Sequence, residues 1–142
     1  MSQENVEIAK RLYVATASLL EKASAGGDIS DAPEYWELFD PDVVIVEIAE
    51  FPDAATYRGP EQMRRWLQGW LDVFDKISIE PQEFVPVGDR VLVATHQRFR
   101  SKVGIEVEQD ITQVLQFRGG RVIHATGYRD KSNALKAVGL AE

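Results

Sequence analysis

The chain has 142 residues, of which 44% are hydrophobic and 27% are charged, and its formal net charge is −7 with an isoelectric point of about 4.9. These values are typical of one soluble domain over residues 1–142, and the acidity argues against a nucleic acid or a membrane surface as partner. Because the chain has no cysteine and only two histidines, disulfides, thiolate chemistry and a histidine-rich metal site are not expected. We expect a cytoplasmic protein with no metal and no cofactor.

Apolar residues recur at three- and four-residue steps near the start of the chain, which predicts an amphipathic helix. Glycines after this stretch end the helix. A short apolar run bounded by turn residues then predicts a buried strand. The elements predicted in this half are a helix over 4–23, a short helix over about 32–39 capped by Asp31, a strand over 43–48 and a loop over 50–59.

Pro60 opens the clearest amphipathic helix of the chain, because proline is favoured in the first turn and an aromatic stripe follows at helical spacing. After Asp75 the pattern alternates with a period of two, which indicates strands. Pro81 and Pro86 predict an irregular first strand in this region. The predicted strands are 77–87, 90–101, 105–117 and 121–129, and a closing helix is predicted over 131–138.

Helices therefore come first, and strands joined by short turns follow, which is the α+β arrangement. We expect a long, curved antiparallel sheet wrapped around three helices from the N-terminal half of the chain. Such a cone has an open mouth and is a natural place for an apolar pocket.

Glu47 stands inside the apolar strand predicted over 43–48. A carboxylate that faces a protein interior is costly unless it is paired, protonated or used. A general base is built in this way. The alternative is a glutamate at the end of a strand that reaches solvent or pairs with Arg58.

Strand alternation places Gln109 and Gln113 on the same face as Ile105, Val107 and Leu115, which predicts that both amides are buried. A buried amide needs hydrogen-bond partners, so each glutamine either belongs to a structural network or points at a ligand. In the preceding strand, Gln97 and Phe99 share a face.

Three segments of the chain carry a resemblance to a known family, and they are Leu38-Phe39-Asp40-Pro41-Asp42, Thr56-Tyr57-Arg58-Gly59 and Arg118-Gly119-Gly120-Arg121-Val122. Over essentially its whole length the chain resembles the SnoaL-like branch of the nuclear-transport-factor-2-like superfamily, which implies a cystatin-like α+β barrel. The superfamily includes ketosteroid isomerases, polyketide cyclases, epoxide hydrolases and non-catalytic binding domains, so the fold does not fix an activity. The resemblance also implies a homodimer packed through the outer face of the sheet, where Val114, His124 and Tyr128 are expected.

Ketosteroid isomerases use a base carboxylate with a tyrosine and a protonated aspartic acid as oxyanion donors. The resemblance places these catalytic roles on Glu47, Tyr13 and Gln113, and the glutamine would donate an N–H group where the family has a carboxylic acid. The resemblance also implies that Arg129 faces the pocket. Tyr13 is otherwise an ordinary half-buried aromatic residue of its helix.

The expected pocket wall combines aromatic and apolar residues of the helices and strands with two polar groups. Tyr57 is either a lid over this pocket or a hydrophobic contact at the start of the helix. The predicted substrate-binding residues are Trp36, Ile45, Tyr57, Met63, Trp66, Trp70, Phe99, Gln109 and Arg129.

Two functions follow from this pocket. In the first, an isomerase or cyclase removes a proton next to a carbonyl of a hydrophobic polyketide- or steroid-like substrate, with Glu47 as base. In the second, the domain binds a hydrophobic small molecule, or associates with a partner, without turnover. We expect His96 and His124 at a subunit interface or in solvent rather than in the site.

Overall fold

The computed structural model describes residues 2–140, and the side chains of residues 3–140. Its first half contains the helices α1 (Ser2–Ser24) and α2 (Pro33–Trp36), the strands β1 (Phe39–Ile48) and β2 (Thr56–Arg58), and the helix α3 (Gly59–Val73). Its second half contains the strands β3 (Phe74–Val87), β4 (Arg90–Ser101), β5 (Glu106–Arg118) and β6 (Arg121–Tyr128), and the helix α4 (Lys131–Ala137).

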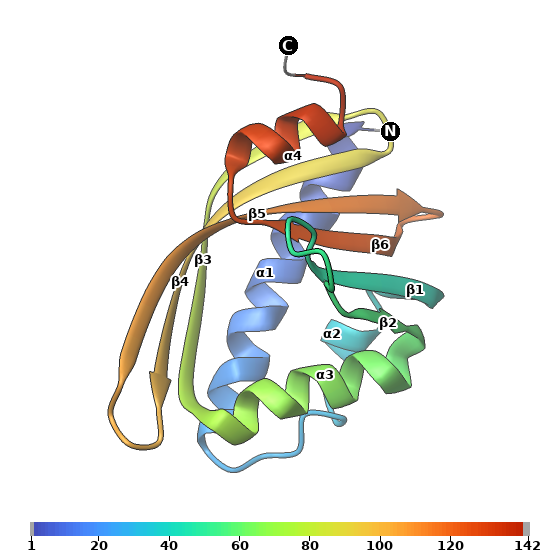
Figure 1. Ribbon diagram of the computed structural model, residues 1–142. Helices are drawn as coiled ribbons and strands as arrows, with labels where there is room; N and C mark the ends of the chain where they lie inside the picture. The colour runs from blue at the N-terminus through green and yellow to red at the C-terminus, as the bar shows by residue number, and fades with distance from the viewer. Residues whose placement is uncertain (1, 141–142) are drawn as a thin grey trace.

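The strands form one sheet in the order β2-β1-β6-β5-β4-β3. The sheet curves strongly, and α1 runs along its concave side while α3 crosses one end (Figure 1). The predicted α+β cone is therefore confirmed. Neighbouring strands are antiparallel with one exception, because β1 pairs with β6 in parallel.

The main core lies between α1 and the concave side of the sheet. Val6, Ala9 and Leu12 of α1 are buried, and they share a cluster with residues of β1, β4 and β5. The three-residue spacing of these positions puts them on one side of the helix, so burying that side fixes α1 against the sheet. The helix α1 therefore forms one wall of the cavity described below.

The helix α3 begins at Gly59, and Pro60 lies in its first turn, as expected. Arg58 at its N-cap is extended and provides no side-chain cap. Its buried residue Met63 and its half-buried Trp66 pack against the main core. The helix therefore lies over the cavity side of the sheet with its aromatic stripe turned inward.

The strand β3 lies at the edge of the sheet, where prolines are tolerated because a missing N–H need not face a partner strand. The expected irregularity is confirmed, since the pairing with β4 shifts register between Pro81 and Glu83.

The predicted boundaries need three corrections. The segment predicted as a loop contains β2, whose three residues pair with β1 through Val44–Arg58, Ile45–Tyr57 and Val46–Thr56. The strand β1 starts at Phe39 rather than residue 43. Asp31 does not cap α2, because Ala32 occupies the N-cap position without a side-chain hydrogen bond.

The prediction that Ile105 and Val107 are buried is wrong. Their side chains are 62% and 43% exposed, and Ile105 precedes the start of β5. Alternation correctly places Ile111 and Leu115 in the interior, where both are buried. The outer end of the β4–β5 hairpin extends past the helices, so no element covers the apolar face there (Figure 1).

The helix α4 packs on the convex face of the sheet, opposite α1 (Figure 1). Ala134 and Val138 form a second small core with Leu92 of β4 and Val114 of β5. Val114, which was expected on the exposed outer face, is therefore only 7% exposed and is covered by the chain's own helix.

Candidate functional site

A cavity of about 380 Å³ lies between the concave face of the sheet and the helices α1 and α3. Apolar side chains form most of its wall. The predicted site residues that line it are Tyr13, Ile45, Glu47, Met63, Trp66, Trp70, Phe99, Gln109, Gln113 and Arg129. A mostly apolar cavity with a few polar groups is typical of a small-molecule site.

Two predicted site residues lie elsewhere. Trp36 does not line the cavity; it packs in the core beside Tyr35 and Phe39, and its Nε1 donates to the Ile29 carbonyl at 2.7 Å. Tyr57 lines a second, more open groove on the outer side of α3, and its ring contacts that of Trp66.

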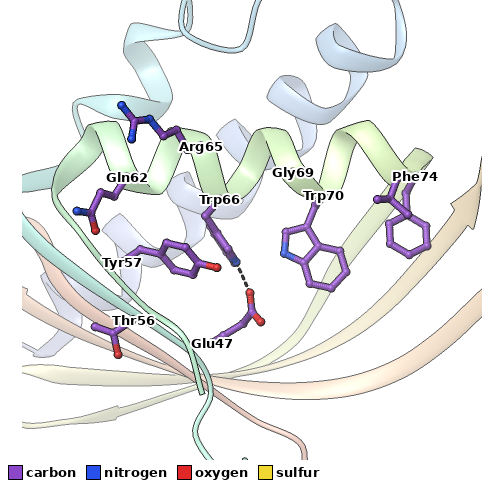
Figure 2. A pocket seen from close by; sticks show the side chains of 10 residues that line it. Glu47, Thr56, Tyr57, Gln62, Arg65, Trp66, Gly69, Trp70 and Phe74 are labelled. Carbon is purple, nitrogen blue, oxygen red and sulfur yellow. Dashed lines mark hydrogen bonds between the residues drawn. The ribbon is translucent and has the colours of Figure 1, made fainter. Parts of the chain in front are cut away.

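Glu47 is half-buried on β1, and Nε1 of Trp66 donates to its Oε2 at 2.5 Å. Figure 2 shows the indole N–H of Trp66 pointing at this carboxylate, with the hydroxyl of Tyr57 on the same side. Within residues 2–140 Glu47 forms no ion pair with Arg58, which was the alternative drawn from the sequence. The indole bond instead holds the carboxylate in one orientation.

Glu47, Trp66 and Trp70 line both the cavity and the outer groove. The carboxylate therefore lies where the two spaces meet. Burial first, and the charge of Glu47 second, raise the pKa of the Tyr57 hydroxyl, so this phenol stays protonated beside the carboxylate at neutral pH.

Tyr13 is buried on α1, and its hydroxyl donates a hydrogen bond to Oε1 of Gln113 on β5. Burial, with a smaller effect from the neighbouring Tyr35, raises the pKa of Tyr13 far above its usual value. The phenol is therefore always a donor, and it is directed at Gln113 rather than at the cavity.

This bond determines which end of the Gln113 amide faces the cavity. The carbonyl oxygen accepts from Tyr13, and no buried side-chain nitrogen or oxygen in the described part of the chain lacks a partner. Because no other side-chain bond involves Gln113 there, its Nε2 reaches the cavity surface, where it can donate to a ligand.

Gly127 of β6 separates the two polar groups. It pairs with Gln113 on one side, and on the other side an added Cβ would lie 3.5 Å from the Glu47 carbonyl oxygen. Adjacent strands are about 4.8 Å apart, so the backbones of Glu47 and Gln113 are about 10 Å apart. The added Cβ would also meet side-chain atoms of Ile48 at 3.3 Å and of Ile111 at 3.5 Å, so these side chains and Gly127 together form an apolar floor between the two polar groups.

Several cavity residues were not predicted from the sequence, and Tyr35, Gln97 and Phe51 are the ones that bear on the site. Tyr35 of α2 lines the cavity, and its hydroxyl has no hydrogen-bond partner among residues 2–140. Gln97 lines it from β4, directly opposite Gln109. Phe51 reaches it from the β1–β2 loop. Only Gln97 had a signal in the sequence, because it shares the alternating face of Phe99.

No cluster of three or more histidine, cysteine, aspartate or glutamate residues able to hold a metal ion occurs within residues 2–140. The helices in this part of the chain lack the combination of length and apolar character needed to cross a membrane.

A sequence profile of the SnoaL-like domain family matches residues 19–125, which is more than half of the chain. No curated protein matches the chain.

Solved structures with the same fold include an NTF2-like protein of unknown function from Burkholderia pseudomallei K96243, at 18% identity, TM-score 0.73, and coverage of 98% of this chain and 99% of that one. TerC, co-crystallised with polyporic acid, is 20% identical with a TM-score of 0.71, over 95% of this chain and 97% of that one. A candidate SnoaL-like polyketide cyclase from Jannaschia sp. CCS1 is 16% identical with a TM-score of 0.69, over 100% of this chain and 96% of that one. At these identities the likeness shows the fold alone.

Proposed function

The chain belongs to the SnoaL-like domain family, and from this premise we propose that it is an isomerase or cyclase that removes a proton next to a carbonyl of a hydrophobic small molecule. The observation that supports this most is the position of Glu47. Its carboxylate opens into an apolar cavity and is held there by the indole of Trp66 at 2.5 Å. A general base must be oriented in this way toward the proton that it takes.

In the proposed step, Glu47 takes the proton from carbon and the electrons of the broken C–H bond move onto the carbonyl oxygen. The resulting enolate oxygen accepts a hydrogen bond from Nε2 of Gln113, with the free hydroxyl of Tyr35 as a second donor from the cavity wall. Tyr13 acts through Gln113 and is a positioning residue. One such donor typically stabilises the transition state by about 3 kcal/mol. Glu47 then returns the proton to another carbon.

The floor of the cavity suits a flat, ring-containing substrate. Gly127 adds no side chain of its own to the apolar floor between base and donor, and Trp66 and Trp70 provide aromatic surface at one side. Among the structural relatives, TerC was crystallised with polyporic acid and another is a candidate polyketide cyclase. We propose polyketide- or steroid-like ketones as the substrate class.

Deuterium exchange tests this chemistry without knowledge of the natural substrate. The protein is incubated in D2O with hydrophobic cyclic ketones such as 2-tetralone, and loss of the protons next to the carbonyl is followed by NMR. We expect catalysed exchange in the wild type and a fall of at least about 100-fold in Glu47→Gln, because the amide cannot accept the proton.

Glu80→Gln is the matched control, since Glu80 is an exposed glutamate of β3 outside the cavity. A titration of tryptophan fluorescence with phenols, which resemble an enolate, measures binding in parallel. Exchange that survives in Glu47→Gln at the wild-type rate would remove Glu47 from the role of base.

Binding without turnover is the second candidate function. The observation in its favour is that the hydroxyl of Tyr13 is directed at Gln113, so one of the donors implied by the family resemblance does not reach the ligand. Phenol binding that is equal in the wild type and in Glu47→Gln, together with no catalysed exchange on any ketone, would favour this function.

A further inference from the structure

We propose that the open end of the cavity is an anion-binding subsite built on Arg129, and that the ligand is therefore a hydrophobic molecule carrying a carboxylate. The inference rests on the proposed function, because it uses the same cavity. Arg129 and Phe51 both line the cavity and are both exposed, so they lie at its opening.

The strand register places this subsite at a definite distance from the proposed chemistry. Gln113 pairs with Gly127, and Thr112 pairs with Tyr128, so Arg129 comes level with Ile111 at the end of β6. Two residues of strand span about 7 Å. A ligand whose ring lies over Gly127 can therefore reach Arg129 with a group at its outer end.

The guanidinium of Arg129 has no ion-pair partner among the described residues, although the carboxylates of Glu50 and Asp130 lie near its backbone. Both of these carboxylates accept hydrogen bonds from other groups. Glu50 accepts from the backbone N–H of Arg129 at 2.6 Å, from that of Asp130 at 2.9 Å, and from the side chain of Asn133 at 2.9 Å. Asp130 caps α4 by accepting from Ser132 at 2.9 Å. The charge of Arg129 is thus left for a ligand.

Phe51 determines how the guanidinium is presented. The guanidinium carbon of Arg129 lies 5.8 Å from the centre of the Phe51 ring, which is a cation–π contact. The ring packs against the group, and no hydrogen bond to its N–H groups occurs among the described residues, so these donors remain available. They match the two oxygens of a carboxylate in a bidentate pair.

Gln109 adds a neutral donor on the same side of the cavity. It lies on β5 two positions before Ile111, toward the β4–β5 hairpin, and lines the cavity. Its side chain forms no hydrogen bond within residues 2–140. The opening therefore offers a guanidinium and an amide to an anionic group, whereas the inner end offers the Glu47 carboxylate and the Gln113 amide. This polarity favours a ligand with its acid group outward.

Binding of three matched biphenyls tests the inference. The probes are 4-biphenylcarboxylate, which is ionised at pH 7.5, its neutral carboxamide, and 4-phenylphenol, and tryptophan fluorescence gives their dissociation constants. We expect the wild type to bind the carboxylate more tightly than the carboxamide. Arg129→Gln should weaken carboxylate binding about 10- to 100-fold, because a hydrogen bond to a charged group is lost, and should change carboxamide binding less than about twofold.

Arg121→Gln is the matched control, because it removes the same charge from the other end of β6, outside the cavity. Arg129→Lys keeps the charge but loses the paired N–H groups of the guanidinium, and its affinity for the carboxylate should lie between those of Arg129→Gln and the wild type. An equal effect of Arg129→Gln on carboxylate and carboxamide, or no effect on either, would overturn the subsite.

The outcomes separate this inference from the proposed function. Phenol binding and Glu47-dependent exchange without any carboxylate preference would overturn the anion subsite alone. An Arg129-dependent carboxylate preference without Glu47-dependent exchange would support the subsite and overturn the proposed reaction. Failure of every probe to bind would overturn both, since both require an accessible cavity.

Discussion

At the scale of single residues, Tyr13 links the core to the cavity. Its ring packs edge-on against Phe84, with the centroids 6.0 Å apart, and its hydroxyl donates to Gln113. The bond connects α1 to β5 through side chains that are 100 positions apart in the chain. Removing it would leave the Gln113 oxygen without a partner and free the amide to rotate.

We therefore predict that Tyr13→Phe lowers the free energy of unfolding by about 1–3 kcal/mol, which is the cost of leaving a buried acceptor unpaired. It should also weaken phenol binding, because Nε2 of Gln113 is no longer held toward the cavity. Urea unfolding measures the first effect and fluorescence titration measures the second.

Tyr35→Phe is the control for stability. Tyr35 is as buried as Tyr13, at 6% against 5% exposure, but its hydroxyl has no partner among the described residues. Its removal should change the free energy of unfolding by less than about 0.5 kcal/mol. Equal losses in the two variants would mean that the Tyr13–Gln113 bond does not stabilise the fold.

The sequence predicted the position of Tyr13 better than its role. Helical spacing put it on the apolar side of α1, because that pattern is local. Its hydrogen-bond partner depends on how α1 packs across the sheet, which no local pattern encodes. Tyr35 gave no signal for a similar reason, since α2 has four residues and shows no periodicity.

At the scale of elements, α3 contains a glycine that the helix does not need. Gly69 lies in its middle, is exposed, and a Cβ added there would meet nothing within 4 Å. Glycine within a helix costs about 1 kcal/mol relative to alanine, because the unfolded chain loses more freedom. Gly69→Ala should therefore raise the free energy of unfolding by about 0.5–1 kcal/mol in urea.

Gly59 at the start of the same helix provides the contrast. Its φ of +80° is the left-handed region that residues with a Cβ avoid. Gly59→Ala should lower the free energy of unfolding by about 1–2 kcal/mol. If Gly69→Ala also destabilised the protein, the space beside Gly69 would be filled in solution.

Elements with a strong internal pattern were predicted well, and elements defined by their partners were not. The periodic pattern and Pro60 located α3 within a few residues. The strand β2 has only three residues and exists because they pair with β1. Likewise, the apolar face of β5 was predicted too long, because alternation does not reveal where the covering helices end.

At the scale of the whole molecule, the convex face of the sheet is divided into two parts. The helix α4 covers one part through Leu92 and Val114. The other part carries charged side chains, in which Arg98 bonds Glu108 at 3.1 Å and His96 bonds Asp110 at 2.7 Å. The homodimer through this face stays a prediction, and any such contact would have to form beside α4.

His96 makes the stability of the fold depend on pH. Its Nδ1 contacts Asp110, and its Nε2 lies 3.4 Å from Oε1 of Glu108, the same oxygen that Nε of Arg98 contacts at 3.1 Å. The hydrogen bond with Asp110, followed by that with Glu108, raises the pKa of His96 above its usual value of 6.5. Protonation of His96 therefore favours the folded state.

The sign of the pH effect follows from this shift. A raised folded-state pKa gives stability that is fully present below about pH 6.5 and is lost as the pH rises through the folded-state pKa. We predict that His96→Gln is less stable than the wild type at pH 6, and that this difference shrinks toward pH 9. Urea unfolding at a series of pH values measures it.

His124, the second histidine, is the internal control because its shift has the opposite direction. Burial, followed by the charge of Arg58, lowers its pKa, so protonation disfavours the folded state. As the pH falls below about 6.5, the wild type should lose stability relative to His124→Gln, whereas its advantage over His96→Gln, which builds up above pH 6.5, should stay constant. NMR titration should place the midpoint of His96 above 6.5 and that of His124 below it. Midpoints in the reverse order would show that the carboxylates of β5 do not bind His96 in solution.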